Sequence, residues 1–146
     1  MPEKKDILLV YTDGGSRGNP GPAAIGVLIG DKSYSQAIGQ ATNNVAEYRA
    51  VIFALQKIKQ LLGKEKLKKT EVIVHLDSEL VYSQLCGKYK ILEPELQPLF
   101  IAVWNLKLDF AKLSFKKISR QDNKAADRLV NLALDQETKD NALFKN

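Results

Sequence analysis

Four acidic residues stand where the chain passes between expected elements. Asp13 follows an apolar, β-rich run that begins at Ile7, and Asp77 directly follows a second such run. Glu47 and Asp127 fall in the first turns of two expected helices. Strand C-termini and helix N-termini tend to converge in α/β folds, so we expect the four carboxylates to meet. Unit charges about 4 Å apart repel by roughly 4 kcal/mol at an effective dielectric of 20, so such a cluster favours a bound cation.

Each acid taken alone also has an ordinary structural explanation. Glu47 lies three residues after Asn44, as in a capping box, and Asp77 could cap a following helix. Asp127 would complement a helix dipole, and Asp13 precedes glycine, as turn residues often do. The four together favour a metal site with oxygen ligands only, which is typical of Mg²⁺ or Mn²⁺. Two such ions about 3.5–4 Å apart can activate water and stabilise the leaving oxygen in phosphodiester cleavage.

The charge balance favours a polyanionic partner. The 146 residues include 22 basic and 17 acidic side chains, which gives a net charge of +5. A basic surface alone does not establish such a partner, since many basic proteins bind nothing in particular. A basic surface around a small acidic centre is, however, what a metal-dependent nuclease needs.

Length and composition predict a single domain over residues 1–146, with a core over about 7–135 and a short C-terminal tail. The lone Cys86 excludes an internal disulfide and, among apolar neighbours, is expected to be a buried thiol. With one histidine, His75, a zinc site of the Cys/His type is excluded. Residues 1–6 lack the apolar core of a signal peptide, and no run approaches the ~18 apolar residues of a membrane span. We expect a cytoplasmic monomer with no membrane association, and no protein partner can be inferred.

The hydrophobic pattern predicts the order β-β-β-α-β-α-α-β-α, hence a mixed sheet with helices packed on its faces. The glycine-rich segment 14–22 is expected to be a long loop, Gly63 is expected to end the first helix, and Trp104 is expected in the core. The expected strands are 7–12, 23–29, 34–41, 72–76 and one beginning at 113–115, and the expected helices are 44–62, 78–85, 96–108 and 123–135.

Four segments carry the motifs of a known family. In chain order they are YTDGGSRGNPGPAAIG, ATNNVAEYRAVIFAL, HLDSELV and DNKAADRLVNLAL. They resemble the successive motifs of type 1 ribonuclease H, the RNase HI family, over about residues 7–134. The resemblance implies a ribonuclease H-like α/β fold, with a five-stranded mixed sheet of three antiparallel and two parallel strands and helices on both faces. It also implies an endoribonuclease that hydrolyses the RNA strand of RNA–DNA hybrids and leaves 5′-phosphate and 3′-hydroxyl ends.

The resemblance also implies roles for the four acids, which would hold two Mg²⁺ or Mn²⁺ ions with the substrate. Asp13 would bridge both ions, and Asp127 would help to hold the ion that activates the attacking water. Glu47 and Asp77 would serve the ion at the leaving group, with Glu47 also near a ribose 2′-hydroxyl.

Further residues match family positions that contact the hybrid. Those in the glycine-rich segment would touch RNA 2′-hydroxyls or the minor groove, which is how A-form-like strands are usually recognised. Asn19 and Thr42 would lie near a DNA-strand phosphate. For the residues of the glycine-rich segment, the alternative is a plain hairpin loop. Asn43 or Asn44 could also cap the following helix, and such capping is compatible with contact to the hybrid. The matching residues are Gly14, Ser16, Gly18, Asn19, Thr42, Asn43 and Asn44.

The chain departs from the family at two places. Many members carry a histidine before the last helix, but residues 118–122 contain none. Arg120 is the candidate for that vacant electrostatic role, and a solvated surface arginine is its alternative. The basic, Trp-rich helix of some members is missing from residues 86–97, which leaves Lys88, Tyr89 and Lys90 as a reduced substitute. A non-catalytic hybrid-binding module and another nuclease of the same fold remain as alternative functions, although TNN and GNPGP favour hybrid specificity.

Overall fold

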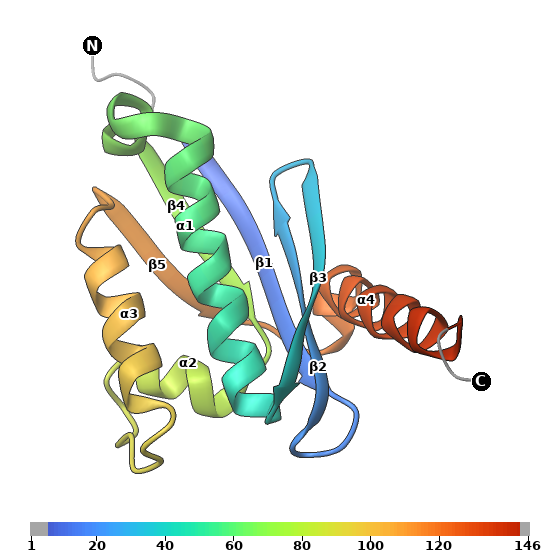
Figure 1. Cartoon of the computed structure of the whole chain (residues 1–146). Coiled ribbons are helices and arrows are strands. Elements are labelled where there is room, and N and C mark those ends of the chain that lie inside the picture. The colour runs from blue at the N-terminus through green and yellow to red at the C-terminus, as the bar shows by residue number, and fades with distance from the viewer. Residues whose placement is uncertain (1–5, 144–146) are drawn as a thin grey trace.

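A five-stranded mixed sheet runs through the computed structural model, which describes residues 6–143 (Figure 1). The strand order is β3-β2-β1-β4-β5. The central strand β1 pairs antiparallel with β2 and parallel with β4, and β5 continues the parallel half. The predicted fold class and order of the main helices and strands are therefore confirmed. The elements are β1 (Asp6–Ser16), β2 (Gly21–Ile29), β3 (Lys32–Ala41), α1 (Asn43–Lys69), β4 (Thr70–Leu76), α2 (Glu79–Leu85), α3 (Gln97–Lys107), β5 (Lys112–Lys117), a 3₁₀ turn (Gln121–Asn123) and α4 (Lys124–Leu143).

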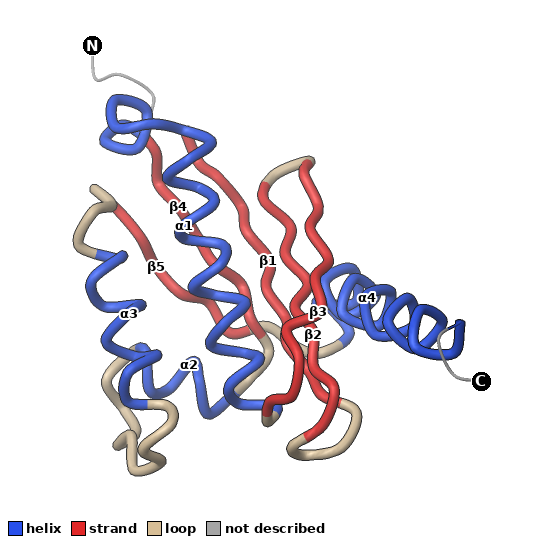
Figure 2. The backbone as a smooth tube through the Cα atoms, viewed as in Figure 1, coloured by secondary structure: helices blue, strands red, loops and turns tan. Residues whose placement is uncertain are grey.

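Helices cover both faces of the sheet. In Figures 1 and 2, α1, α2 and α3 lie on one face, and α4 crosses the other beside β2 and β3. The main core forms between α1 and the sheet, where Val10, Val74 and Leu55 are fully buried. A smaller cluster on the opposite face joins α4 to β2 through Val130 and Ala24. Buried side chains therefore pack against both faces of the sheet beside which the four acids were expected to meet.

The first strand is longer than the sequence indicates. Residues 14–16 continue β1 and pair with residues 23–25 of β2, so the connection is the four residues 17–20 and not a nine-residue loop. Asp13 therefore lies inside a strand, opposite Gly26, and not at its end. The glycines favour a turn by composition, but the backbone hydrogen bonds to β2 hold this segment extended.

Two helices also extend beyond their predicted limits. Gly63 interrupts α1 with a φ of 73°, as predicted, but further helical residues continue to Lys69. The last helix runs to Leu143 and not to Asp135, so residues expected in a tail are helical. None of the described helices is long and apolar enough to cross a membrane.

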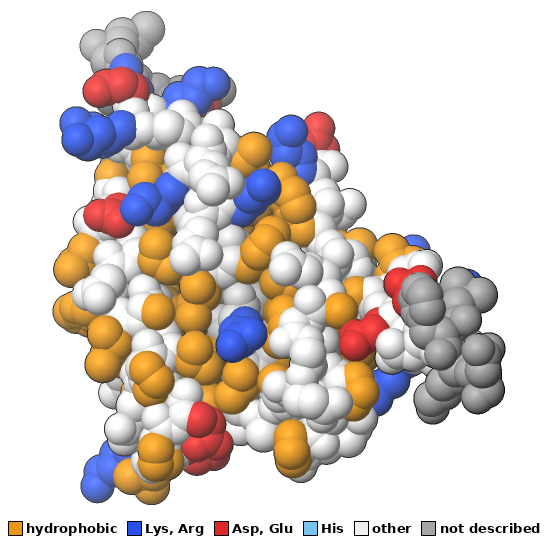
Figure 3. Space-filling view, viewed as in Figure 1, with side chains coloured by type: hydrophobic (Ala, Val, Ile, Leu, Met, Phe, Trp, Pro, Cys, Tyr) orange, Lys and Arg blue, Asp and Glu red, His pale blue; other side chains and the backbone are white. Residues whose placement is uncertain are grey.

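Two predictions of burial were wrong. Trp104 is 54% exposed, because α3 is apolar on most sides and only one of its sides faces the core. Hydrophobic side chains are correspondingly visible on the surface over the α3 side in Figure 3. Cys86 is exposed because it ends the short helix α2, where its backbone N–H caps the last turn. His75 is buried in β4, within the strand expected over residues 72–76, with Nδ1 2.9 Å from the Val10 carbonyl oxygen.

Candidate active site

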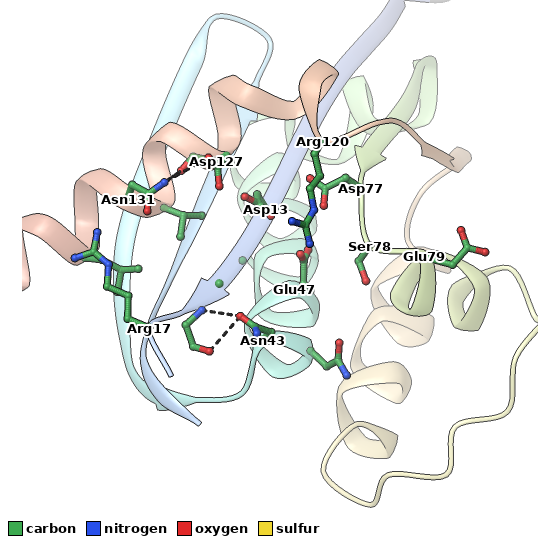
Figure 4. Close-up of a pocket in the computed structure, with 16 residues that line it drawn as sticks. Asp13, Arg17, Asn43, Glu47, Asp77, Ser78, Glu79, Arg120, Asp127 and Asn131 are labelled. Carbon is green, nitrogen blue, oxygen red and sulfur yellow. Dashed lines mark hydrogen bonds between the residues drawn. The ribbon is translucent and has the colours of Figure 1, made fainter. Parts of the chain in front are cut away.

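Three of the four acids meet at one point. Asp13 reaches it from β1, Glu47 from the beginning of α1, and Asp77 from the residue after β4. Each offers one carboxylate oxygen, and these three oxygens lie within 4.8 Å of one another. Figure 4 shows the three side chains converging in a pocket at this edge of the sheet. The predicted convergence therefore holds for these three residues.

The close approach of β1 to α1 depends on Gly14. A Cβ atom built on Gly14 would lie 2.2 Å from the carbonyl carbon and oxygen of Ala46, which is too short for any real contact. Only glycine lets the strand lie directly against the first turns of the helix, and this contact brings Asp13 beside Glu47. Gly14 was predicted as a substrate contact, and the structure gives it this packing role as well.

The structural alternatives for three of the acids do not apply. Thr42 is the N-cap of α1, with its Oγ1 accepting from the Val45 N–H at 3.2 Å, so Glu47 is not part of a capping box based on Asn44. Ser78 caps α2 by accepting from the Val81 N–H at 3.2 Å, which leaves the Asp77 carboxylate free of that task. Asp13 lies within a strand and not in a turn.

Burial makes the cluster electrostatically unfavourable. Asp13 is 7% exposed and Glu47 is 9% exposed, and one buried oxygen of Glu47, Oε2, has no hydrogen-bond partner within residues 6–143. Desolvation, with the neighbouring charge of Asp77, raises the pKa of Asp13 to about 7. Desolvation and the charges of Asp13 and Asp77 raise the pKa of Glu47 well above its usual range. A bound cation would relieve both effects, because it favours the ionised carboxylates.

The fourth acid, Asp127, lies at the edge of the same pocket. It is exposed on the first turn of α4 and faces the other acids in Figure 4. Its Oδ2 accepts a long hydrogen bond, 3.4 Å, from the side chain of Asn131. Among the described residues, its oxygens lie outside the compact group of three. The predicted quartet is therefore a compact triad, in which Asp13 and Glu47 are buried and Asp77 is half-buried, with Asp127 at the rim.

The position of α4 depends on a second glycine, Gly26. A Cβ atom there would lie 2.2 Å from the Ala126 carbonyl oxygen and 2.8 Å from the Leu129 Cβ. Because Gly26 pairs with Asp13 across the sheet, this contact places the first turn of α4 next to the strand position of Asp13. The sequence prediction did not include this role, since a glycine inside a strand shows no partner by itself.

The residues present fit a divalent cation. Three carboxylates converge with no cysteine or histidine in the group, a donor set that suits hard ions such as Mg²⁺ or Mn²⁺. The Oε2 of Glu47, which no donor of the described residues contacts, offers a further acceptor to a cation.

The predicted substrate residues form part of the pocket rim. The Asn43 Oδ1 accepts from the backbone N–H of Ser16 at 2.9 Å and from its hydroxyl at 3.1 Å. The Asn43 backbone N–H in turn donates to the Asn19 Oδ1 at 3.0 Å. The short β1–β2 connection is thus fixed to the beginning of α1. Of the predicted set, Gly14, Ser16, Asn43 and Asn44 line the acidic pocket, whereas Gly18, Asn19 and Thr42 lie outside its lining.

Two residues next to α4 complete the site. Arg120 lines the pocket, and its side chain extends over the acids in Figure 4. Asn123, which the sequence suggested only as a helix start, is 1% exposed and donates to Asp77 at 2.8 Å. Its place four residues before Asp127, one helical turn away, was the only sequence signal that could have identified it.

Comparisons with known proteins agree with this geometry. A family model described as "Reverse transcriptase-like" matches residues 11–133. Ribonuclease HI of Halobacterium salinarum is 38% identical over 141 residues, which cover 92% of this chain and 68% of the relative. The bifunctional protein Rv2228c of Mycobacterium tuberculosis is 40% identical over 135 residues, which cover 88% of this chain. These 135 residues cover 35% of Rv2228c, so this chain spans about a third of the length of that relative.

The fold also matches solved structures. LC11-RNase H1, isolated from compost, has a TM-score of 0.86 and 44% identity, over 91% of this chain and 99% of that one. A second structure of LC11-RNase H1, in complex with an RNA/DNA hybrid, has a TM-score of 0.84 and 43% identity, over 90% of this chain and 99% of that one.

Proposed function

The chain belongs to the ribonuclease HI family, and we propose that it is an endoribonuclease that hydrolyses the RNA strand of RNA–DNA hybrids. The observation that carries the proposal is the convergence of Asp13, Glu47 and Asp77 within 4.8 Å in a pocket that Asp127 also lines. The hybrid bound to LC11-RNase H1 supports the choice of substrate. The proposed products carry 5′-phosphate and 3′-hydroxyl ends.

The four acids would hold two Mg²⁺ or Mn²⁺ ions, with Asp13 shared between them. When bound, such ions would supply Lewis-acid chemistry, which activates water and stabilises a leaving oxygen. The protein contributes a fixed arrangement of ligands, because Asp13 and Glu47 are buried and their backbones are packed against each other through Gly14. Preorganised charges of this kind need little rearrangement during reaction.

The rest of the pocket would bind and orient the hybrid. Ser16 and Asn43 lie beside the acids, where their polar groups can reach RNA 2′-hydroxyls. Asn19 and Thr42 lie next to this rim and would contact the DNA strand. Arg120 extends over the acids and would attract the scissile phosphate, in place of the histidine that many family members carry.

Amide variants of the acids test the proposal. Asp13→Asn and Asp77→Asn should abolish cleavage of a labelled hybrid in saturating Mg²⁺, because each removes a charged ligand from the group of three converging carboxylates. Both variants should remain folded and should still bind the hybrid. Asp31→Asn, in the exposed β2–β3 turn, is the matched control and should cleave at the parental rate. Activity of Asp13→Asn within about tenfold of the parent, less than 1.4 kcal/mol in barrier, would reject the metal assignment.

A further inference from the structure

Asn123 makes contacts that link three parts of the active site. It ends the 3₁₀ turn before α4, and its side-chain amide is buried between β1 and the end of β4. One amide group, Nδ2, donates to the Thr12 carbonyl oxygen at 2.9 Å and to the Asp77 Oδ2 at 2.8 Å. Thr12 directly precedes Asp13 in the strand. The amide therefore fixes the Asp77 carboxylate relative to the backbone that carries Asp13.

The chemistry of the amide suits a metal ligand. An Asn side chain is neutral, so it can orient the Asp77 carboxylate without cancelling the charge that attracts a cation. A lysine or arginine in the same place would form an ion pair and compete with the metal. Oδ2 of Asp77 accepts this hydrogen bond, and the same carboxylate offers an oxygen to the group that converges with Asp13 and Glu47.

The burial of Asn123 has a cost in folding stability. Its carbonyl oxygen Oδ1 is buried without a hydrogen-bond partner among the described residues. An unsatisfied buried polar group of this kind ordinarily lowers stability and calls for an explanation. An apolar side chain would avoid this penalty but would release the Asp77 carboxylate. Orientation of that carboxylate explains why an amide occupies the position.

We propose that Asn123 is a positioning residue, which holds the Asp77 carboxylate in the orientation that binds the catalytic metal. It also anchors the beginning of α4, which carries Asp127 one turn later. The inference rests on the metal site of the proposed function. It adds that metal affinity depends on a residue that does not itself bind the metal.

Metal titration of Asn123→Ala tests this role with Mg²⁺ or Mn²⁺ alone, by calorimetry and by the metal-dependent rise in melting temperature. The half-saturating metal concentration should increase by about tenfold or more, as is typical when a residue that orients a metal ligand is removed. Asn105→Ala, an exposed asparagine on α3, is the matched control and should bind metal like the parent. If Asn123→Ala is unfolded at the assay temperature, Asn123→Ser measured in the cold replaces it.

A double-mutant cycle separates positioning from a general structural role. In an Asp77→Asn background, Asn123→Ala should change metal affinity by less than about twofold, because the carboxylate that it orients is already gone. Lower stability of Asn123→Ala with parental metal affinity would overturn the inference, as would the same loss of affinity in both backgrounds. If the parent binds metal and cleaves the hybrid, and Asn123→Ala binds metal equally well, only this inference is rejected. A parent without metal binding or cleavage rejects the proposed function, and this inference with it.

Discussion

The acids at the centre of the site are placed at a cost to stability. Asp13 and Glu47 are buried beside each other, and the two arginines of the pocket, Arg17 and Arg120, form no ion pair with either among the described residues. Carboxylates in such surroundings ionise with difficulty, which is why the pKa of Asp13 is raised to about 7. Strongly shifted pKa values in a cleft are typical of functional groups. The same shift predicts how stability responds to pH.

The metal-free protein should lose stability as pH rises from about 4 to about 7. In this range the unfolded chain has released the Asp13 proton while the folded protein still holds it, so rising pH favours unfolding. The slope should reach up to about 1.4 kcal/mol per pH unit for each such group. Denaturant unfolding in chelator across this range measures it. Saturating Mg²⁺ and the variant Asp13→Asn should each flatten the profile, whereas stability that rises with pH throughout the window would contradict the shifted pKa.

At the scale of elements, two close contacts bring the acids together. Gly14 lets β1 lie against α1, and Gly26 lets α4 lie against β2. Neither glycine has a side chain that could contact a metal ion. Gly14 nevertheless sets the distance between β1 and α1, which carry Asp13 and Glu47, and Gly26 sets the position of α4, which carries Asp127. The site therefore depends on backbone packing as much as on the acids themselves.

Gly26→Ala should displace α4 and with it Asp127. The added methyl group would clash with the Ala126 backbone, and overpacking of this kind costs about 1–3 kcal/mol. A shift of about 1 Å in a catalytic group can lower the rate by roughly 10²-fold. Hybrid cleavage and thermal unfolding measure the two effects.

Gly39→Ala is the matched control for that variant. Gly39 has a φ of 80° but open space around its Cβ position, so alanine there should lower stability without moving α4. Equal loss of cleavage in both variants would show that stability, and not the position of α4, limits activity.

Regular apolar patterns predicted the type and order of the main elements. The ends of some elements depend instead on contacts between residues distant in sequence, which a local pattern does not show. The apolar run in β2 and the helical spacing of apolar residues in α1 predicted the correct types. The end of β1 was misplaced because glycines resemble a turn, and only pairing with β2 keeps them extended. The length of α4 was underestimated because residues beyond Asp135 are polar and carry no apolar spacing.

The acidic site was predicted more fully than the residues around it. Four acids at element boundaries were visible along the chain, and three of them meet. Asn123 was missed because its two partners, Thr12 and Asp77, lie 111 and 46 residues away, and no local pattern reveals such contacts. Thr42 was not predicted as the cap because Asn43 and Asn44 are equally good capping residues by type.

At the scale of the molecule, the net charge of +5 should govern affinity for the hybrid. Lys88 and Lys90 lie in the α2–α3 connection, where Tyr89 is 3.4 Å from the carboxylate of Glu79 at the pocket edge. Lys88→Ala and Lys90→Ala should each weaken hybrid binding and reduce the slope of log affinity against log salt by roughly 1. Lys64→Ala, beyond the Gly63 break and away from the pocket, is the control. Slopes unchanged in both test variants would place the binding surface elsewhere.

Cleavage of matched substrates is the most direct test of metal-dependent hydrolysis of the RNA strand in a hybrid. Labelled RNA–DNA, RNA–RNA, DNA–DNA and single-stranded RNA would be incubated with the protein, with and without Mg²⁺ or Mn²⁺. We expect internal cleavage of the RNA strand of the hybrid, only with metal, to products with 5′-phosphate ends. Cleavage of duplex DNA as fast as the hybrid would indicate another nuclease of this fold. Hybrid binding without cleavage in either metal would show a binding module and would contradict the proposed ribonuclease activity.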